Sequence, residues 1–240
     1  LAYTLFPYTT LFRSVRPMTK YAVQVTEPER IRYELEKAVF MALDGKPGPV
    51  WLDIPVDVQA LEIDENSLLC FDKPIRSYDC KEGDIEKTIE LLNQAKRPLL
   101  LLGHGIRMGN AISEMNRLIE ALRIPVMTTW NGVDLISDDN PLFFGRPGAS
   151  GMRHANIIQQ NADLVITLGT RLNLLSTGYD YDSFLRNARH IMVEIDENEM
   201  KKKSLHPYLS VCCDVKSFLR GMLKKIDQVH MGDMTGWISF

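Results

Sequence analysis

Residues 98–105 read Pro-Leu-Leu-Leu-Leu-Gly-His-Gly, and this stretch decides the fold. Its apolar part is typical of a strand that is buried on both faces of a parallel sheet. The glycines that follow are typical of a tight turn from a strand into a helix. Similar apolar strands, separated by helices with apolar residues at helical spacing, are predicted outward from it. The other strands are predicted at 125–128, 164–168, 190–195 and 208–212, the helices at 84–95, 110–122, 152–161 and 215–225, and a helical turn near 181–188.

This alternation predicts an α/β fold. Strands that are apolar along their whole length indicate a sheet covered by helices on both faces. Right-handed crossovers then give a doubly wound, mostly parallel sheet of about six strands. In such sheets, ligands bind beyond the carboxyl ends of the strands. We therefore look for functional side chains directly after each strand.

The chain before residue 84 is organised differently. Thr26-Glu27-Pro28-Glu29 has the spacing of a capping box and predicts the start of a helix. The run Gly45-Lys46-Pro47-Gly48-Pro49 ends that helix. The next residues, 50–54, are mostly apolar and predict a short strand.

Five segments are expected. Residues 61–83 are rich in acidic and turn residues and predict a linker, with a domain boundary near residue 75. Residues 1–14 are expected to be an extraneous tail, such as translated vector sequence, although a strand would also suit them. The other three segments are a small piece at 15–60, the α/β domain at 84–226 and the start of another linker at 227–240.

The composition argues against several classes of protein. With 45% hydrophobic and 25% charged residues, the chain can bury a sizeable core and is not expected to be disordered. The net charge of −3 gives no basic surface for nucleic acid. No apolar run approaches the roughly 20 residues that span a bilayer, and Leu1–Ser14 lacks the basic start of a signal peptide. We expect a cytoplasmic protein with neither a nucleic-acid nor a membrane partner.

The sequence contains no recognisable catalytic or metal-binding motif. Cys70, Cys80, Cys212 and Cys213 form no C-x-x-C motif and are expected to be reduced thiols. The histidines lack the spacing of zinc ligands. There is also no G-x-S-x-G motif and no obvious nucleophile–base pair. No catalytic residue and no metal ligand is therefore predicted.

The first two strand ends carry glycines, hydroxyls and an amide. Gly103, His104 and Gly105 could line a phosphate, but with Gly109 they form G-x-G-x-x-x-G, which departs from the dinucleotide fingerprint. A plain strand-to-helix turn explains them equally well. Thr129-Trp130-Asn131 suits a polar ligand, or alternatively a helix cap or turn.

Later segments extend the pattern. Gly148-Ala149-Ser150 would let a flat ligand approach the backbone, or would form an ordinary flexible loop. Gly169-Thr170-Arg171 offers a guanidinium to a phosphate or an adenine face, or to a surface carboxylate. Glu194-Ile195 and Asp214-Val215 offer acids to ribose hydroxyls, although Asp214 may instead cap a helix. Together these residues predict a nucleotide-sized groove along one edge of the sheet.

Two regions resemble a known family. The string GKPGPVWLDIPVDVQ at residues 45–59, after Arg16-Pro17-Met18-Thr19-Lys20, resembles the end of the first domain of thiamine-diphosphate enzymes of the acetolactate synthase type. Residues 85–223 resemble that family's central domain, and the whole resemblance covers about residues 15–225. The motifs that follow the family's order are Asn161–Leu164, Leu168–Arg171, Val193–Asp196 and Cys213–Val215.

The resemblance implies a large enzyme of three domains. Residues 15–60 would end the pyrimidine-binding domain, and residues 84–226 would form a central domain of the FAD/NAD-sirtuin-like type. Thiamine diphosphate and Mg²⁺ would be held outside this chain, because the family's activating glutamate and Gly-Asp-Gly motif are not in it. The parent would be a homodimer or homotetramer that decarboxylates a 2-oxo acid and passes the carbanion equivalent to an acceptor carbonyl. The chain alone would be inactive.

The family's central domain can hold FAD, which implies roles for the strand-end residues. Gly103, His104 and Gly105 would line the phosphates, and Arg16 would reach the flavin nucleotide from the first domain. In place of the family's Phe-Asp-Asp-Arg stands Leu172-Asn173-Leu174-Leu175. A stand-alone nucleotide-binding module and a purely structural domain remain alternatives. The resemblance also implies that Thr129, Trp130 and Asn131 lie beside the isoalloxazine, and that Glu194, Ile195, Asp214 and Val215 lie at the adenosine end. Two further sets of contacts replace family motifs. Gly148, Ala149 and Ser150 stand in place of Gly-Met-His, and Gly169, Thr170 and Arg171 stand in place of Gly-Ala/Val-Arg.

Overall fold

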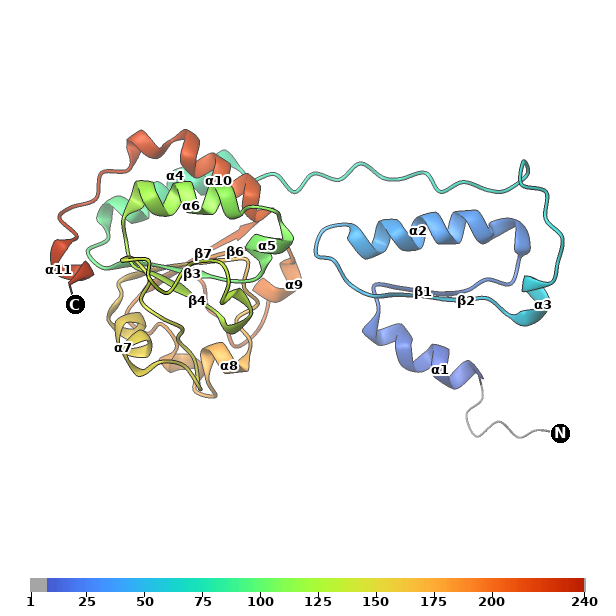
Figure 1. Ribbon diagram of the computed structural model, residues 1–240, viewed down its shortest axis with the longest axis horizontal. Coiled ribbons are helices and arrows are strands. Elements are labelled where there is room, and N and C mark those ends of the chain that lie inside the picture. The colour runs from blue at the N-terminus through green and yellow to red at the C-terminus, as the bar shows by residue number, and fades with distance from the viewer. Residues whose placement is uncertain (1–7, 240) are drawn as a thin grey trace. The chain divides into compact units, whose positions relative to one another are not determined.

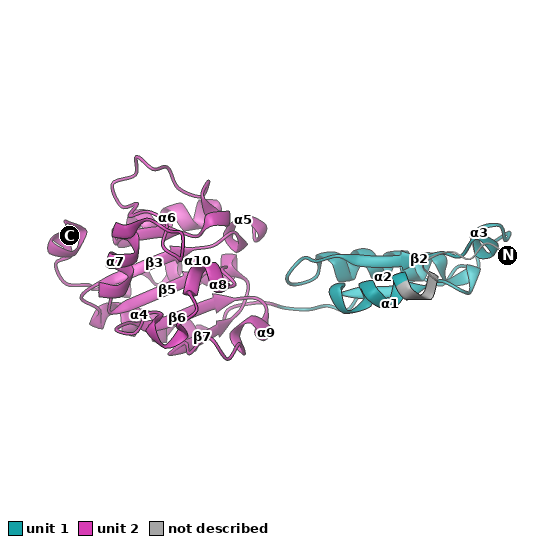
Figure 2. Cartoon of the chain, turned by 90° about the horizontal axis from the view of Figure 1, so that it is seen from below, with its two compact units in different colours: residues 1–77 teal, residues 78–240 magenta. Residues whose placement is uncertain are grey.

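The computed structural model of this chain describes residues 8–239 and divides it into two compact units. The first unit is residues 1–77 and the second is residues 78–240 (Figure 2). None of the described helices is long and apolar enough to cross a membrane.

The first unit is built around a small parallel sheet. Strand β1 (Tyr21–Gln24) pairs with β2 (Val50–Asp53) in the register Tyr21 to Val50. Helix α2 (Ile31–Leu43) joins the two strands (Figure 1). The sequence predicted β2 but missed β1, because Tyr-Ala-Val-Gln has no continuous apolar run. The other elements here are α1 (Tyr8–Val15), η1 (Arg16–Met18), η2 (Pro28–Arg30) and α3 (Val56–Gln59).

The predicted capping box before α2 is wrong. Residues 28–30 form a single 3₁₀ turn, and no side chain caps either η2 or α2. Pro28 has no N–H, and the amide of Arg30 donates to Glu27 O at 3.1 Å, which closes the tighter turn. Within residues 1–14, positions 8–14 belong to helix α1, so the alternative that this stretch forms a strand is wrong for them. Residues 1–7 lie outside the described part.

The second unit contains a parallel sheet of five strands in the order β4-β3-β5-β6-β7. The predicted α/β class is confirmed. The sheet has five strands, against the expected number of about six. Phe143 forms only an isolated parallel bridge to Val126, beside β4. The strands are β3 (Pro98–Leu102), β4 (Val126–Thr128), β5 (Leu164–Leu168), β6 (Arg189–Glu194) and β7 (Leu209–Cys212).

Helices cover both faces of this sheet (Figure 1). Helices α4 (Glu82–Gln94), α6 (Ile112–Leu122) and α10 (Val215–Lys224) lie on one face, and α7 (Arg153–Asn161) and α8 (Leu174–Thr177) lie on the other. The predicted helix at 110–122 is confirmed as α6, and the sequence missed the short helix α5 (Gly105–Met108) before it; Asn110, with a positive φ of 50°, separates the two. The short elements are α5 (Gly105–Met108), η3 (Trp130–Gly132), η4 (Tyr181–Ser183), α9 (Glu197–Met200), η5 (Ile226–Gln228) and α11 (Thr235–Ile238).

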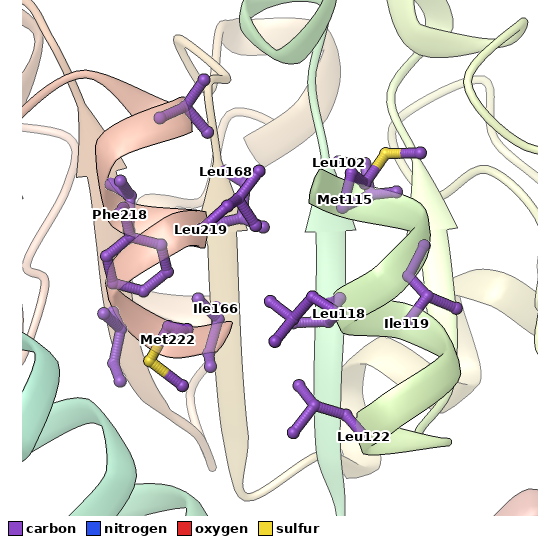
Figure 3. Packing of buried hydrophobic residues seen from close by; sticks show 14 of the residues in the cluster. Leu102, Met115, Leu118, Ile119, Leu122, Ile166, Leu168, Phe218, Leu219 and Met222 are labelled. Carbon is purple, nitrogen blue, oxygen red and sulfur yellow. The ribbon is translucent and has the colours of Figure 1, made fainter. Parts of the chain in front are cut away.

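The alternation of side chains along each strand divides the core into two clusters. Leu100 and Leu102 of β3 belong to the cluster under α4, α6 and α10, whereas Leu99 and Leu101 belong to the cluster with α7. Figure 3 shows α6 and α10 placing Leu118, Phe218 and other apolar side chains against the strands of the first cluster. Each such side chain contributes about 1.5–3 kcal/mol when fully buried. The sheet is therefore a rigid platform for the loops at its edges.

The C-terminal segment packs against the second unit. Residues 227–240 were expected to start a linker, but they include α11, whose Trp237 is buried. The indole Nε1 of Trp237 donates to Pro98 O at 2.8 Å, at the start of β3.

Candidate functional site

The carboxyl ends of the five strands share one edge of the sheet, because all neighbouring strands in it run parallel. The predicted site residues that follow these strands are brought together at that edge, as the sequence predicted. The residues that come directly after the strands are Gly103, Thr129, Gly169, Ile195 and Cys213.

The ends of β3 and β5 are in direct backbone contact. The amide of Gly103 donates to Leu168 O at 2.9 Å, and the amide of Gly105 donates to Gly169 O at 2.8 Å. A Cβ atom on Gly103 would overlap Gly169 O, and one on Gly105 would lie 2.6 Å from the same oxygen. Gly169 itself has a φ of +58°. These glycines are therefore needed by the chain's own close approach, as the turn alternative predicted.

The end of β4 is joined to the same turn. The amide of Thr129 donates to Leu102 O at 2.9 Å, and His104 Nδ1 lies 2.8 Å from Asn131 O, to which it can donate. Trp130 begins the short helix η3 and is 56% exposed. An indole in this position is available to stack on a flat ligand.

A buried hydroxyl at this strand end has no partner. Thr128 is fully buried, and its Oγ1 makes no hydrogen bond within the described part of the chain. An unsatisfied buried hydroxyl costs free energy unless another group pairs with it. The sequence places Thr128 in the polar stretch Thr128–Gly132 at this strand end, but only Thr129, Trp130 and Asn131 were predicted as ligand contacts.

The loop around Gly148 is hydrogen-bonded to two helices. Gly148 has a φ of +133°, and its amide and carbonyl both pair with the side-chain amide of Asn156 at 2.9 and 3.0 Å. The amide of Ala149 donates to Leu175 O at 2.8 Å. Ala149 and Ser150 are exposed. Residues of α7 and α8 thus both hydrogen-bond to this loop, and its contact with a ligand stays a prediction.

Arg171 takes part in an ion pair that the sequence analysis did not identify. Its Nε donates to Glu199 Oε1 at 2.8 Å, while Glu199 also pairs with Lys202. Lys202 Nζ further donates to Arg171 O at 3.0 Å. Glu199 is buried, but the side chain of Arg171 is 64% exposed. The carboxylate alternative for Arg171 is confirmed, and its exposed guanidinium remains accessible to an anion.

The two acids at the far strand ends serve local turns. Glu194 is buried, and its Oε1 accepts from the amides of Ile195 and Asp196 at 3.0 and 3.4 Å. Asp214 caps α10, since its Oδ1 accepts from the amide of Ser217 at 3.0 Å. The helix-cap alternative for Asp214 is thus confirmed.

Two predicted site residues do not contribute in the same way. Val215 packs against Gly109 in the connection from β3 to α6, since a Cβ atom on Gly109 would lie 2.9 Å from Val215 Cγ1. Arg16 lies in η1 of the first unit, and its contact with a nucleotide stays a prediction.

Neither a metal-ligand cluster nor a buried histidine lies at this edge in the described part of the chain. In residues 8–239, no group of three or more His, Cys, Asp or Glu side chains could hold a metal ion. His190 is the one buried histidine in the described part of the second unit, and desolvation lowers its pKa to about 4. Its Nε2 lies 2.9 Å from Thr167 Oγ1, in the middle of the sheet rather than at the edge.

Residues 85–222 match the family model described as "Thiamine pyrophosphate enzyme, central domain". The chain belongs to this family. The match covers most of the second unit, so the five-stranded sheet is the family's central domain. The predicted resemblance is therefore confirmed, and thiamine diphosphate is the cofactor that defines the family.

Curated relatives agree with the family model. A "Probable acetolactate synthase large subunit" of Methanococcus aeolicus is 34% identical over 218 residues, which cover 89% of this chain and 36% of that protein. The "Acetolactate synthase isozyme 1 large subunit" of Escherichia coli is 31% identical, covering 88% of this chain and 37% of that protein. An "Acetolactate synthase, chloroplastic" of Arabidopsis thaliana is 31% identical, covering 92% and 33%. The chain spans about a third of the length of these relatives.

Residues 172–175, where the resemblance implies Phe-Asp-Asp-Arg, lie partly in the core and partly on the surface of this central domain. Leu172 is buried in the cluster with α7 and adopts a positive φ of 49°. Leu174 and Leu175 are exposed at the start of α8. The residues at these positions are thus a buried core contact and an apolar surface instead of a set of charged groups.

Proposed function

We propose that the parent of this central domain is a thiamine-diphosphate-dependent enzyme that decarboxylates a 2-oxo acid. It transfers the resulting carbanion equivalent to an acceptor carbonyl, as a transferase of branched-chain amino acid biosynthesis. The support is that relatives named as acetolactate synthase large subunits align with about nine-tenths of this chain. Thiamine diphosphate and Mg²⁺ are held by residues outside this chain, in a cytoplasmic homodimer or homotetramer.

Within that enzyme, the carboxyl edge of the sheet seats FAD or another adenine nucleotide. The observation that carries this proposal is the convergence of the ends of β3, β4 and β5 on one edge, with Trp130 and Arg171 exposed there. An indole stacks on an aromatic ring, and a guanidinium binds phosphate. The unpartnered hydroxyl of Thr128 provides a further polar group at the end of β4.

The residues present suit the adenine nucleotide better than the flavin ring. Arg171 offers charge for the diphosphate that ADP and FAD share, whereas Leu174 and Leu175 offer no hydrogen bond to the polar edge of a flavin ring. The glycines do not form an open cradle, since Gly103 and Gly105 are packed against Gly169. FAD, if bound, would act as a scaffold with no net redox role, as the family resemblance implies.

Calorimetric titration of the purified chain with FAD, ADP and NAD tests this proposal. Trp130→Ala should weaken binding at least several-fold, because it removes the exposed ring beside β4. Tyr208→Ala is the matched control: Tyr208 is 59% exposed and directly precedes β7, at the opposite edge of the sheet. Binding of FAD with yellow colour would favour a flavin site, and ADP alone would favour a plain nucleotide site. If the two substitutions weaken binding equally, the nucleotide does not bind at the carboxyl edge of the sheet.

The activity of the parent needs a separate test. The chain alone should release no carbon dioxide from pyruvate, even with thiamine diphosphate and Mg²⁺ added. The chain joined to the flanking domains of its open reading frame should do so. Turnover by the chain alone would refute the assignment of the thiamine site to other domains.

A purely structural domain is the second candidate. The observation that favours it is the direct packing of Gly103 and Gly105 against Gly169, which explains these glycines without any ligand. In that case, none of the three nucleotides would shift the melting temperature.

A further inference from the structure

Two cysteines that are far apart in the sequence meet on the second unit. Cys80 precedes α4, and Cys213 directly follows β7. Cys80 is half-buried and packs against the apolar cluster that includes the buried Cys213. The two thiols lie near enough to influence each other's pKa, and Cys80 Sγ donates to Lys81 O at 3.7 Å. This pairing was not anticipated from the sequence, which showed only four separate thiols.

The backbone holds the two segments together around this pair. The amide of Asp214 donates to Tyr78 O at 2.7 Å, and the amide of Cys80 donates to Ser217 Oγ at 3.0 Å. These two bonds lie on either side of the thiols in the sequence. The segment 78–80 is thereby fixed along the turn from β7 into α10.

The neighbouring Cys212 lies on the other side of its strand. Successive side chains of a strand point to opposite faces, so Cys212 is exposed while Cys213 is buried. Cys212 Sγ donates instead to Ile195 O at 3.8 Å. Cys70, the fourth cysteine, is exposed in the first unit. Geometry thus selects Cys80 as the partner of Cys213.

We propose that Cys80 and Cys213 form a reversible disulfide when the protein meets hydrogen peroxide. The sulfur of Cys80 attacks one peroxide oxygen, the O–O bond breaks, and the hydroxide that leaves takes a proton to become water. The sulfur of Cys213 then attacks the sulfenic sulfur of Cys80 and expels its oxygen, which leaves as water with the proton of Cys213. Two thiols and one peroxide therefore give one disulfide and two waters, and the peroxide is reduced.

The environments of the two thiols make Cys80 the first to react. The hydrogen bond from Cys213 lowers the pKa of Cys80, although burial and Asp84 oppose this shift. The hydrogen bond to Cys80, burial and the acids Asp214 and Asp84 raise the pKa of Cys213. Cys80 is thus the accessible nucleophile, and Cys213 is the resolving thiol. The disulfide would fasten the segment that leads into α4 to the end of β7.

The test is oxidation of the reduced 240-residue chain with hydrogen peroxide, followed by thiol titration and intact mass. We expect loss of two of the four thiols, a mass lower by two hydrogens, a linked Cys80–Cys213 peptide after digestion, and full reversal by dithiothreitol. The oxidised chain should melt at a higher temperature, because the bond closes a long loop.

Three substitutions separate the specific pair from general oxidation. Cys80→Ser should abolish the disulfide, whereas Cys70→Ser and Cys212→Ser should leave it unchanged. Cys80 is only half-buried, so its serine variant should fold, as its circular dichroism would show. If it does not fold, the linked peptide of the unsubstituted chain remains the deciding measurement. Linkage through Cys70 or Cys212, or an oxidised chain with no Cys80–Cys213 peptide, would overturn the proposal.

Discussion

The stability of a Gly103→Ala variant tests how closely the ends of β3 and β5 approach each other. A Cβ atom on Gly103 would overlap Gly169 O and lie 2.7 Å from Thr170 Cα, which is about 1 Å inside ordinary contact. These neighbours are mostly backbone, so they cannot move aside without shifting a strand end. Gly103→Ala should therefore lower the free energy of unfolding by about 3 kcal/mol, at the upper end of the usual cost of overpacking.

Urea denaturation followed by tryptophan fluorescence measures this change, with the buried Trp237 as a probe of the second unit. Gly83→Ala is the matched control, because a Cβ there meets nothing within 4 Å and the residue lies in helix α4. The control should raise stability by about 0.5 kcal/mol. If the free energy of unfolding of Gly103→Ala lies within about 0.5 kcal/mol of that of the unsubstituted chain, the close approach of β3 and β5 is refuted. That result would also favour an open space for a ligand at this turn.

Two further predictions concern buried polar groups. Burial lowers the pKa of His190 to about 4, below the ordinary 6.5, so the unfolded chain binds this proton more readily than the folded chain. The contribution of neutral His190 to the free energy of unfolding should be complete above pH 6.5 and should decline as pH falls toward 4. His190→Gln should therefore flatten the urea midpoint as a function of pH over this range. An unchanged slope would contradict this prediction. Trp237→Phe keeps an aromatic ring but leaves Pro98 O without the indole donor, so it should cost about 1 kcal/mol in urea denaturation followed by circular dichroism, since the substitution removes the fluorescent probe. A neutral result would show that α11 is not held by this bond.

The candidate site was partly accessible from the sequence. Gly103, Thr129 and Gly169 could be assigned to one edge, because the carboxyl ends of parallel strands must share it. Their local roles could not be assigned, since a turn, a cap and a ligand contact favour the same small and polar residues. The sequence offered a carboxylate as the partner of Arg171 but could not identify it as Glu199. The two residues are separated by β6 and meet only after folding.

The family resemblance came from strings of residues, and the match over residues 85–222 confirms it. The departures inside those strings mattered more for the site. Leu172 stands where the resemblance implies an aromatic residue, and only the structure shows that it is buried with α7. What the sequence could not show was whether such a change empties a ligand position or fills a core position.

The local pattern of the chain was sufficient for the α/β class, because strands such as β3 and β5 must be apolar on both faces to be buried between helices. The strand order β4-β3-β5-β6-β7, the missed strand β1 and the meeting of Cys80 with Cys213 were decided only by tertiary structure. Each depends on contacts between segments far apart in the chain. Hydrophobic periodicity reports which side of an element is buried, but not which partner buries it.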